Sequence, residues 1–468
     1  MTFWEFDIQF GDFILDIAIL NMLLIVGVLC RWRISFFQKY LIPSSLIAGF
    51  LGLILGPELL KILNFQTDRM GLYLYHLLAI LFISIGLQKT QKKKTRGALH
   101  VGFLFVMSYL VQICIGIGSM LFIAYLINPD IVPAIGMLLP LGYGMGPGLA
   151  YSIGYSWEVE YGVAGAGSVG LTISAVGFLI AYFAGMTIVN RGIRRGKSTL
   201  LASPKELNRA TLTGLVTDEN PASAGSLRFH GSSIEPLTFH LGLIGLIYLL
   251  TYFVTTGLDM LLRSVGVNEQ VAILWAFHFL IANLIAVATA KFLRKEGNDN
   301  LIDPGLNQRL TGLFTDYLIV AAIMAISLRV AWDYAGPILL MCIPGAIVTG
   351  FMLKALTYRV FDEHQFERFT GVFGEMTGTL ASGLALVRVT DPEFNTPIAQ
   401  DLGLGSGMAF ILGFPLFVII NMPFVFFEGQ LYGYWIVIGI CLAYILIILF
   451  IWKLFGLKLH QRISNTDL

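Results

Sequence analysis

The sequence predicts an all-α polytopic membrane protein, built from two inverted-topology repeats of about five helices plus one extra C-terminal helix. Three observations lead to this prediction. Apolar runs of membrane-spanning length follow one another along the chain. The basic residues between these runs are distributed with a strong bias. Two Gly-rich segments interrupt the pattern at corresponding places in the two halves.

Composition excludes a water-soluble protein of this length. The 468 residues are 56% hydrophobic and 13% charged, and their mean hydropathy is +0.78. The net charge of +1 gives no reason to expect a nucleic-acid partner. Residues 1–12 lack the basic region of a cleaved signal, so we expect the first apolar run to stay in the mature protein. The cysteines fall in or beside apolar runs and are expected to act as small hydrophobes: Cys30, Cys114, Cys342 and Cys441.

A helix needs about 20 apolar residues to cross the hydrocarbon core of a bilayer. Runs of roughly that length predict eleven spans, near residues 12–30, 41–57, 70–87, 99–127, 162–190, 237–257, 270–291, 313–332, 335–354, 404–427 and 432–452.

Two further apolar segments, 137–156 and 369–388, are too rich in helix-breaking residues to be ordinary spans. Freed backbone at membrane depth is tolerated only where it is buried in protein or lines a cavity. A matched pair of interrupted segments is the best sequence pointer to the binding site of a secondary transporter. The breaking residues are Pro140, Gly142, Gly144, Gly146, Pro147 and Gly148 in the first segment, and Gly371, Gly374, Gly378 and Gly383 in the second.

The basic residues predict the orientation. If the N-terminus lies outside and both Gly-rich segments are re-entrant hairpins, all but four of the 30 Lys and Arg residues lie on the cytoplasmic side. Those four are Lys61, Arg69, Arg263 and Arg329. The C-terminus is then cytoplasmic, the first hairpin enters from outside and the second from inside. The two halves are therefore inverted relative to each other.

This topology predicts four regions. Residues 1–197 form the first repeat, with its hairpin at 137–156, and the polar stretch 198–236 is a cytoplasmic linker. Residues 237–427 form the second repeat, with its hairpin at 369–388, and 428–468 hold the extra helix and a cytoplasmic tail. A weak internal match supports the repeat: Met145, Leu149 and Ala150 recur as Met376, Leu380 and Ala381, and the cluster Gly165–Ser168 recurs as Gly403–Ser406.

The chain is not expected to be an enzyme or to hold a cofactor. Residues Gly165–Gly170 satisfy the pattern G-x-G-x-x-G, but here the pattern opens a spanning helix instead of following a strand. Close helix packing explains these small residues better. The sequence also lacks the nucleophile, zinc and phosphate-loop motifs of common enzymes.

The second hairpin is the polar one and supplies most candidate site residues. Hydroxyls and freed carbonyls are the hard oxygen ligands that sodium prefers, although Thr and Ser can also bond back to their own helix. The candidate sodium ligands are Thr377, Thr379, Glu375, Ser168 and Ser406. The candidate substrate-binding residues are Gly144, Gly146, Gly148, Thr377, Gly378, Thr379, Ser382, Arg388 and Asn283.

Two of these candidates carry alternatives. Arg388 could clamp a substrate carboxylate, pair with Asp391 or extend to the lipid headgroups. Asn283 is the most central of the intramembrane polar residues, but an interhelical hydrogen bond would also explain it. The other polar residues at membrane depth are Asp16, Asn21, Ser84, Gln88, Gln112, His278, Asp316 and Asn421.

Several short motifs resemble those of the bacterial sodium/glutamate symporters. They are Lys39–Pro43, Ala48–Phe50, Ile83–Leu87 and the two Gly-rich hairpins in this order. The resemblance implies a sodium-coupled carrier of acidic amino acids in the inner membrane, with hairpins that meet near the midplane. It also implies a homodimer in which a transport domain moves against a scaffold. Where the family has Gly-Gly-His-Gly and Gly-His-Cys-Gly, this chain has Gly142–Gly148 and Glu375.

The function predicted from the sequence is sodium-coupled symport of glutamate or a similar small anionic metabolite. The alternative is a proton- or sodium-coupled carrier of hydroxycarboxylates such as citrate or malate, since Glu375 and His278 could supply proton coupling. A membrane enzyme or a sensor is the remaining class, and it would need a catalytic set or a soluble output domain.

Overall fold

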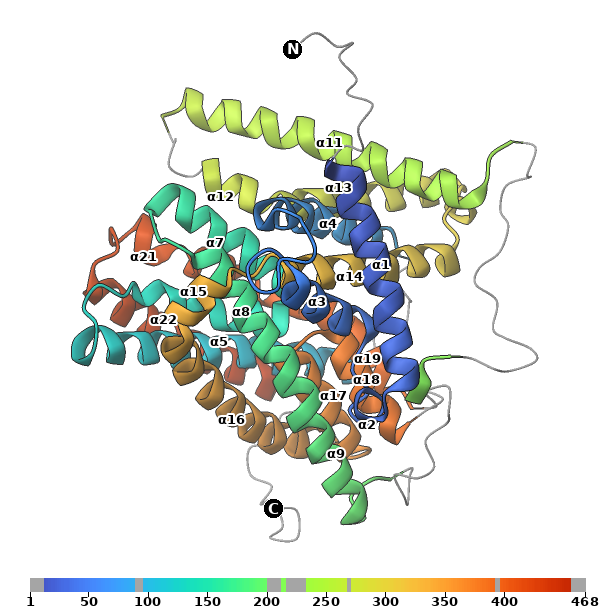
Figure 1. Cartoon of the computed structure of the whole chain (residues 1–468). Coiled ribbons are helices and arrows are strands. Elements are labelled where there is room, and N and C mark those ends of the chain that lie inside the picture. Colours follow the sequence, from blue (N-terminus) through green and yellow to red (C-terminus); the bar gives the residue numbers. More distant parts are fainter. Residues whose placement is uncertain are drawn as a thin grey trace. The chain divides into compact units, whose positions relative to one another are not determined.

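The structure is a computed structural model that describes residues 12–88, 96–199, 212–215, 233–266, 271–391 and 396–455, and every regular element in these ranges is helical (Figure 1). Packing divides the chain into two compact units. Unit 1 consists of Met1–Thr90 and Thr213–Leu328, and unit 2 consists of Gln91–Leu212 and Arg329–Leu468. Each unit therefore takes segments from both halves of the sequence.

Unit 1 is a bundle of long helices with small residues at close contacts. Helix α3 packs against α1 and α14, and α4 packs against α13 and α14. Gly27 lets α1 approach the backbone of Ser44 at the start of α3. The Asn307 amide donates to the Ser84 carbonyl at 2.8 Å and so ties α14 to α4. The elements are α1 (Asp12–Arg33), α2 (Ser35–Lys39), α3 (Ser44–Leu55), α4 (Thr67–Leu87), α11 (Pro236–Ser264), α12 (Val271–Ala276), α13 (His278–Lys295), η5 (Asp299–Leu301) and α14 (Pro304–Met324).

Unit 2 is organised around α5 (Arg96–Leu126), which packs against η1, α16, α19 and α22. This helix is apolar on all faces and mostly buried, as expected of a central helix. The other elements are η1 (Pro133–Met137), α6 (Leu138–Pro140), η2 (Leu141–Met145), α7 (Pro147–Tyr161), α8 (Ala166–Leu179), η3 (Ile180–Ala184), α9 (Gly185–Arg194), α16 (Ala335–Val360), α17 (Gln365–Thr377), α18 (Leu380–Thr390), α19 (Ile398–Leu412), α20 (Phe414–Ile419), α21 (Met422–Val425) and α22 (Leu431–Leu454). Helix α15 (Leu328–Asp333) begins with the last residue of unit 1, and its other residues belong to unit 2.

By length and composition, 7 described helices could cross a membrane: α1, α4, α5, the continuous α8–η3–α9, α11, α16 and α22. This confirms the all-α membrane-spanning character predicted from the sequence.

The remaining four of the eleven expected spans are shorter or divided. The run 41–57 gives only α3, between Pro43 and Gly56, and the run 270–291 divides at Phe277. The run 313–332 is divided because α14 ends at Met324. The run 404–427 gives α19, α20 and α21, since prolines near the start of α20 and α21 cannot continue a preceding helix.

The two expected broken segments each form two helical arms around a break. The first extends further than expected, with η1, α6 and η2 before the break and α7 after it. The second consists of α17 and α18. Most of the predicted linker 198–236, the basic stretch 89–95 and the tail beyond 455 lie outside the described residues.

Candidate functional site

The first break lies at Gly146, between η2 and α7. Gly146 has φ 91° and ψ 166°, a backbone region that is essentially restricted to glycine. Pro147 occupies the first position of α7, where its missing N–H costs no hydrogen bond. Before the break, η2 is a wide π-helical turn, a feature that often marks functional sites. The Gly- and Pro-rich sequence therefore produces a helix N-terminus inside the unit.

The second break lies at Gly378, with φ -143° and ψ -103°, and at Thr379, which is extended. Ser382, in the first turn of α18, holds this break together. Its Oγ accepts from the Thr379 N–H at 2.8 Å and lies 2.7 Å from the Gly374 carbonyl oxygen. A Cβ on Gly378 would collide with this hydroxyl. The predicted turn at 377–379 therefore coincides with the break in the structure.

The two breaks lie against each other within unit 2. A Cβ built on Gly146 would contact Cγ2 of Thr379 at 3.5 Å. A Cβ built on Gly144 would lie 3.3 Å from Sδ of Met376, in the last turn of α17. Residues far apart in the sequence thus meet at one place, and the predicted glycines and threonine are brought together.

Two helix N-termini converge where the breaks meet. Helix α7 begins at Pro147 and contains Gly148 in its first turn, and α18 begins at Leu380. First-turn amides have no carbonyl partner in their own helix, and the helix dipole gives this end partial positive charge. The point where the breaks meet therefore presents two helix N-termini, each of which favours an anion.

The last residues of α17 supply oxygen atoms at the same place. The Thr377 hydroxyl donates to the Phe373 carbonyl at 2.8 Å, which is the back-bonding that the sequence left open. The Thr377 carbonyl oxygen would lie 2.5 Å from a Cβ on Gly177, so the glycine in α8 lets this carbonyl approach. The Thr379 hydroxyl oxygen is buried and forms no hydrogen bond of ordinary geometry among the described residues, although it faces the Ser382 amide in a capping-box arrangement.

Glu375 places a carboxylate one turn before the second break. The residue is only 3% exposed. Ser406 of α19 donates to Oε1 at 2.6 Å, whereas Oε2 is buried and has no hydrogen-bond partner in the described ranges. An ionised carboxylate in such surroundings is costly unless a cation or a proton neutralises it. The arrangement suits a group that binds a small cation or carries a proton.

Gln112 of α5 also reaches the second break, and the sequence had not assigned it to the site. Its amide nitrogen donates to the Met376 carbonyl at 3.0 Å and lies 3.2 Å from Oγ1 of Thr349 in α16. Its Oε1 is buried without a partner in the part of the chain that the structure describes. A glutamine inside a long apolar helix was the available signal, because such a side chain needs polar partners.

Three further predicted residues have local surroundings of their own. Arg388 is exposed in the last turn of α18, about 13 Å along the helix from Thr379. Ser168 is half-buried in the first turn of α8, and its carbonyl accepts from a hydroxyl one turn on. Asn283 belongs to unit 1, where its amide donates to the Phe82 carbonyl at 2.9 Å. That bond is the interhelical alternative left open by the sequence.

The histidine considered for proton coupling, His278, also belongs to unit 1. Its ring stacks on Tyr75 with 3.9 Å between centroids, and Nδ1 lies 2.9 Å from the Trp275 carbonyl oxygen. Glu375 belongs to unit 2.

Within the described residues, no group of three or more His, Cys, Asp or Glu side chains could hold a metal ion. The ligands at the breaks are instead hydroxyls, carbonyls and one carboxylate, which are hard oxygen donors. A comparison with family models finds no match for this chain, and a search of curated proteins finds none either.

Proposed function

We propose that the chain is a secondary transporter that imports glutamate or a similar small anionic metabolite together with sodium, by alternating access. The observation that carries this proposal is the contact between the two helix breaks at Gly146 and Thr379, beside the buried carboxylate of Glu375. Discontinuous helices with anion-attracting and cation-attracting ends are the typical binding sites of secondary transporters.

The converging N-termini of α7 and α18 support an anionic substrate. Their first-turn amides can donate to a carboxylate, and the Gly146 and Gly148 positions let the substrate approach the backbone. The bidentate clamp predicted at Arg388 is not part of this proposal, because that side chain is exposed near the far end of α18. Recognition would depend on backbone amides and on the Thr379 hydroxyl, with the Ser382 hydroxyl holding the break in shape.

Glu375 supports a coupling cation. A bare carboxylate beside an anion site would repel the substrate, so the site should accept the anion only after Glu375 is neutralised. Sodium bound to Oε2, with nearby carbonyls and hydroxyls as further ligands, would do this. One net positive charge moved inward supplies about 2.3 kcal/mol per 100 mV of membrane potential, which can drive concentrative uptake.

The division into units supports the mechanism that the resemblance implies. In unit 2, α5, the first break and α8–α9 come from the first half, and α16, the second break and α19–α21 come from the second. In unit 1, α1, α3 and α4 correspond in order to α11, α13 and α14. This order fits two inverted repeats, with unit 2 as the moving transport domain, unit 1 as the scaffold and a homodimer in the inner membrane.

The experiment is uptake of radiolabelled glutamate into proteoliposomes that contain the purified chain. We expect accumulation with an inward sodium gradient and none with choline in place of sodium. A panel of unlabelled anions, including aspartate, citrate and malate, is then added, and the degree to which each reduces glutamate uptake ranks their affinities. Accumulation that is driven equally well by a proton gradient without sodium would contradict sodium coupling.

A proton is the alternative coupling ion, and the same observation favours it: a proton on Glu375 Oε2 would also neutralise the carboxylate. Proton coupling belongs to the alternative function, the transport of hydroxycarboxylates such as citrate or malate. It predicts that uptake of citrate or malate exceeds that of glutamate and persists in choline when the outside is acidic.

A further inference from the structure

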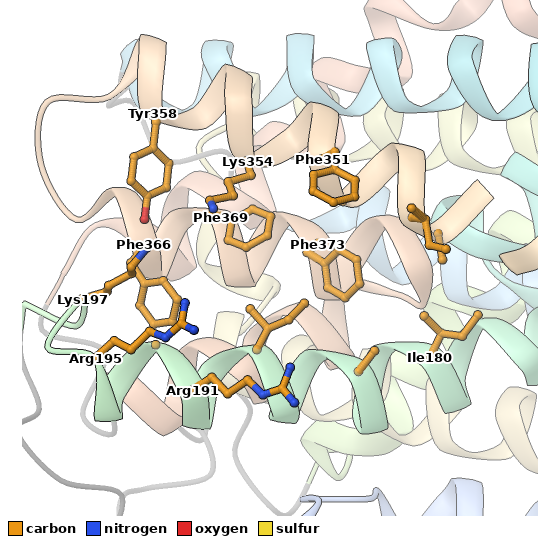
Figure 2. Close-up of a pocket in the computed structure, with 16 residues that line it drawn as sticks. Ile180, Arg191, Arg195, Lys197, Phe351, Lys354, Tyr358, Phe366, Phe369 and Phe373 are labelled. Atoms are coloured by element: carbon orange, nitrogen blue, oxygen red, sulfur yellow. The ribbon is translucent and has the colours of Figure 1, made fainter. Parts of the chain in front are cut away.

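A groove of about 380 Å³ runs between α9, α16 and α17 within unit 2 (Figure 2). Its floor is made by aromatic rings of α17, namely Phe366, Phe369 and Phe373. Phe351 of α16 forms part of the wall and is 70% exposed, so the groove opens at the surface of the unit. The site proposed for transport does not use this groove.

Two glycines give the groove its shape. A Cβ on Gly192 of α9 would collide with the ring of Phe366, and a Cβ on Gly350 of α16 would lie 3.2 Å from the ring of Phe373. The rings of α17 therefore sink between the neighbouring helices and leave the space above them open. This packing makes the groove a fixed feature of the fold.

The groove is apolar at one end and basic at the other. Figure 2 shows Ile180 of η3 at one end of the groove, with Arg191 of α9 and then Arg195 and Lys197 toward the other end, and Lys354 on α16. None of the described residues that line the groove is acidic. Arg191 and Arg195 are exposed one helical turn apart, so their guanidinium groups can approach the same phosphate.

The length of the groove fits one leaflet of a bilayer. The lining residues extend from position 346 to 358 along α16, which is about 18 Å of helix. One leaflet contributes about 15 Å of hydrocarbon. The basic end lies on the face that the charge pattern predicts to be cytoplasmic, where basic pockets between membrane helices bind anionic headgroups.

We propose that this groove binds an anionic phospholipid, with one acyl chain over the phenylalanine rings of α17 and the phosphate between Arg191, Arg195 and Lys354. The basic residues select an anionic headgroup, and the length of the apolar surface fits one acyl chain. Because the lipid touches α9, α16 and α17 together, it would stabilise the packing of the second break's first arm against both neighbouring helices.

The test is a competition between dioleoyl phosphatidylglycerol and dioleoyl phosphatidylcholine for the purified full-length chain in mixed micelles, with bound lipid counted by native mass spectrometry. The wild-type chain should retain phosphatidylglycerol about tenfold more strongly. The double variant Arg191→Gln/Arg195→Gln should lose this preference. The matched control Arg294→Gln/Lys295→Gln removes two exposed basic residues from the last turn of α13, on the same predicted face, and should keep it.

A second variant tests the acyl chain separately. Ala184 is exposed and lines the groove, so Ala184→Trp should fill it and weaken phosphatidylglycerol binding while leaving the cations in place. Val254→Trp, on an exposed face of α11, is the control for added aromatic surface. Equal retention of the two lipids by the wild-type chain would overturn the proposal. Displacement of phosphatidylglycerol by inorganic phosphate, with no effect of Ala184→Trp, would overturn it in favour of a simple phosphate site.

Discussion

The two helix breaks meet at one place but are built by different means. In the first, the chain turns through Gly146, whose backbone conformation is accessible essentially to glycine alone. In the second, Gly378 and Thr379 both have negative φ, and side chains define the geometry through Ser382, Glu375 and Ser406. The first break presents backbone and the second presents oxygen-bearing side chains.

This difference assigns different roles to equivalent positions in the two halves. A break made of glycines lets a solute approach two helix ends closely and contributes no charge of its own. A break that carries a buried carboxylate can respond to a cation or a proton. Anion recognition is therefore expected to depend on both breaks, whereas ion coupling is expected to depend mainly on the second.

The largest effect is expected at the first break. Gly146→Ala puts a Cβ on a backbone conformation that costs about 1–3 kcal/mol for other residues, although the added Cβ would meet Thr379 Cγ2 only at an ordinary contact distance of 3.5 Å. Uptake should fall about tenfold to a hundredfold. The matched control is Gly162→Ala at the other end of α7, where φ is 67° and no heavy atom lies within 4 Å. If both variants transport equally well, the backbone of the first break is not part of the site.

A loss of uptake is also expected at the second break, but for a steric reason. Gly378→Val introduces a side chain that must displace the Ser382 hydroxyl and break the bonds that close the turn, at about 1 kcal/mol each. Gly407→Val, at an exposed and open position of α19, is the control. Expression and membrane insertion are followed by immunoblot, and transport by uptake. Wild-type kinetics in Gly378→Val would remove this break from the site.

A smaller effect separates the hydroxyl of Thr379 from its methyl group. Thr379→Val keeps the methyl group on the side of Gly146 and loses one oxygen, whereas Thr379→Ser keeps the oxygen and loses that methyl group. Loss of one hydrogen bond or one sodium ligand should raise the sodium concentration for half-maximal uptake several-fold in Thr379→Val. Thr379→Ser should stay near the wild type. The reverse order would mean that packing, and not the hydroxyl, matters at this position.

The smallest effect is expected at Asn283, whose amide bonds to the Phe82 carbonyl in unit 1. Interhelical hydrogen bonds of this kind contribute about 0.6 kcal/mol on average. Asn283→Ala should therefore lower the thermal stability slightly and leave KM for glutamate unchanged. A large rise in KM without any loss of stability would return Asn283 to the binding site.

The comparison of the breaks also shows how far the sequence alone could lead. Gly and Pro density located both breaks, because helices reject these residues for local reasons that are visible in the chain itself. The long apolar helices were also predictable from the chain itself, because each coincides with an apolar run of membrane-spanning length. Glu375 and Ser406, both named as candidate sodium ligands from the sequence, are hydrogen-bonded to each other.

The sequence was less informative where tertiary packing decides. It assigned Arg388 and Ser168 to the site from their residue types, but Arg388 lies about 13 Å along α18 from Thr379, and the Ser168 carbonyl bonds within its own helix. It did not assign Gln112, because nothing local shows that this face of α5 lies beside Met376. The four divided or shortened spans have the same cause, since hydropathy does not show where a helix ends inside an apolar run.

One measurement tests the central account most directly: the affinity of the purified chain for glutamate, measured by equilibrium binding in sodium and in choline. The account predicts about tenfold or more tighter binding in sodium for the wild-type chain. In Glu375→Gln the carboxylate is already neutral, so glutamate should bind equally well in both salts. An unchanged sodium dependence in Glu375→Gln, or none in the wild-type chain, would contradict the proposal that neutralisation of Glu375 couples the two solutes at the helix breaks.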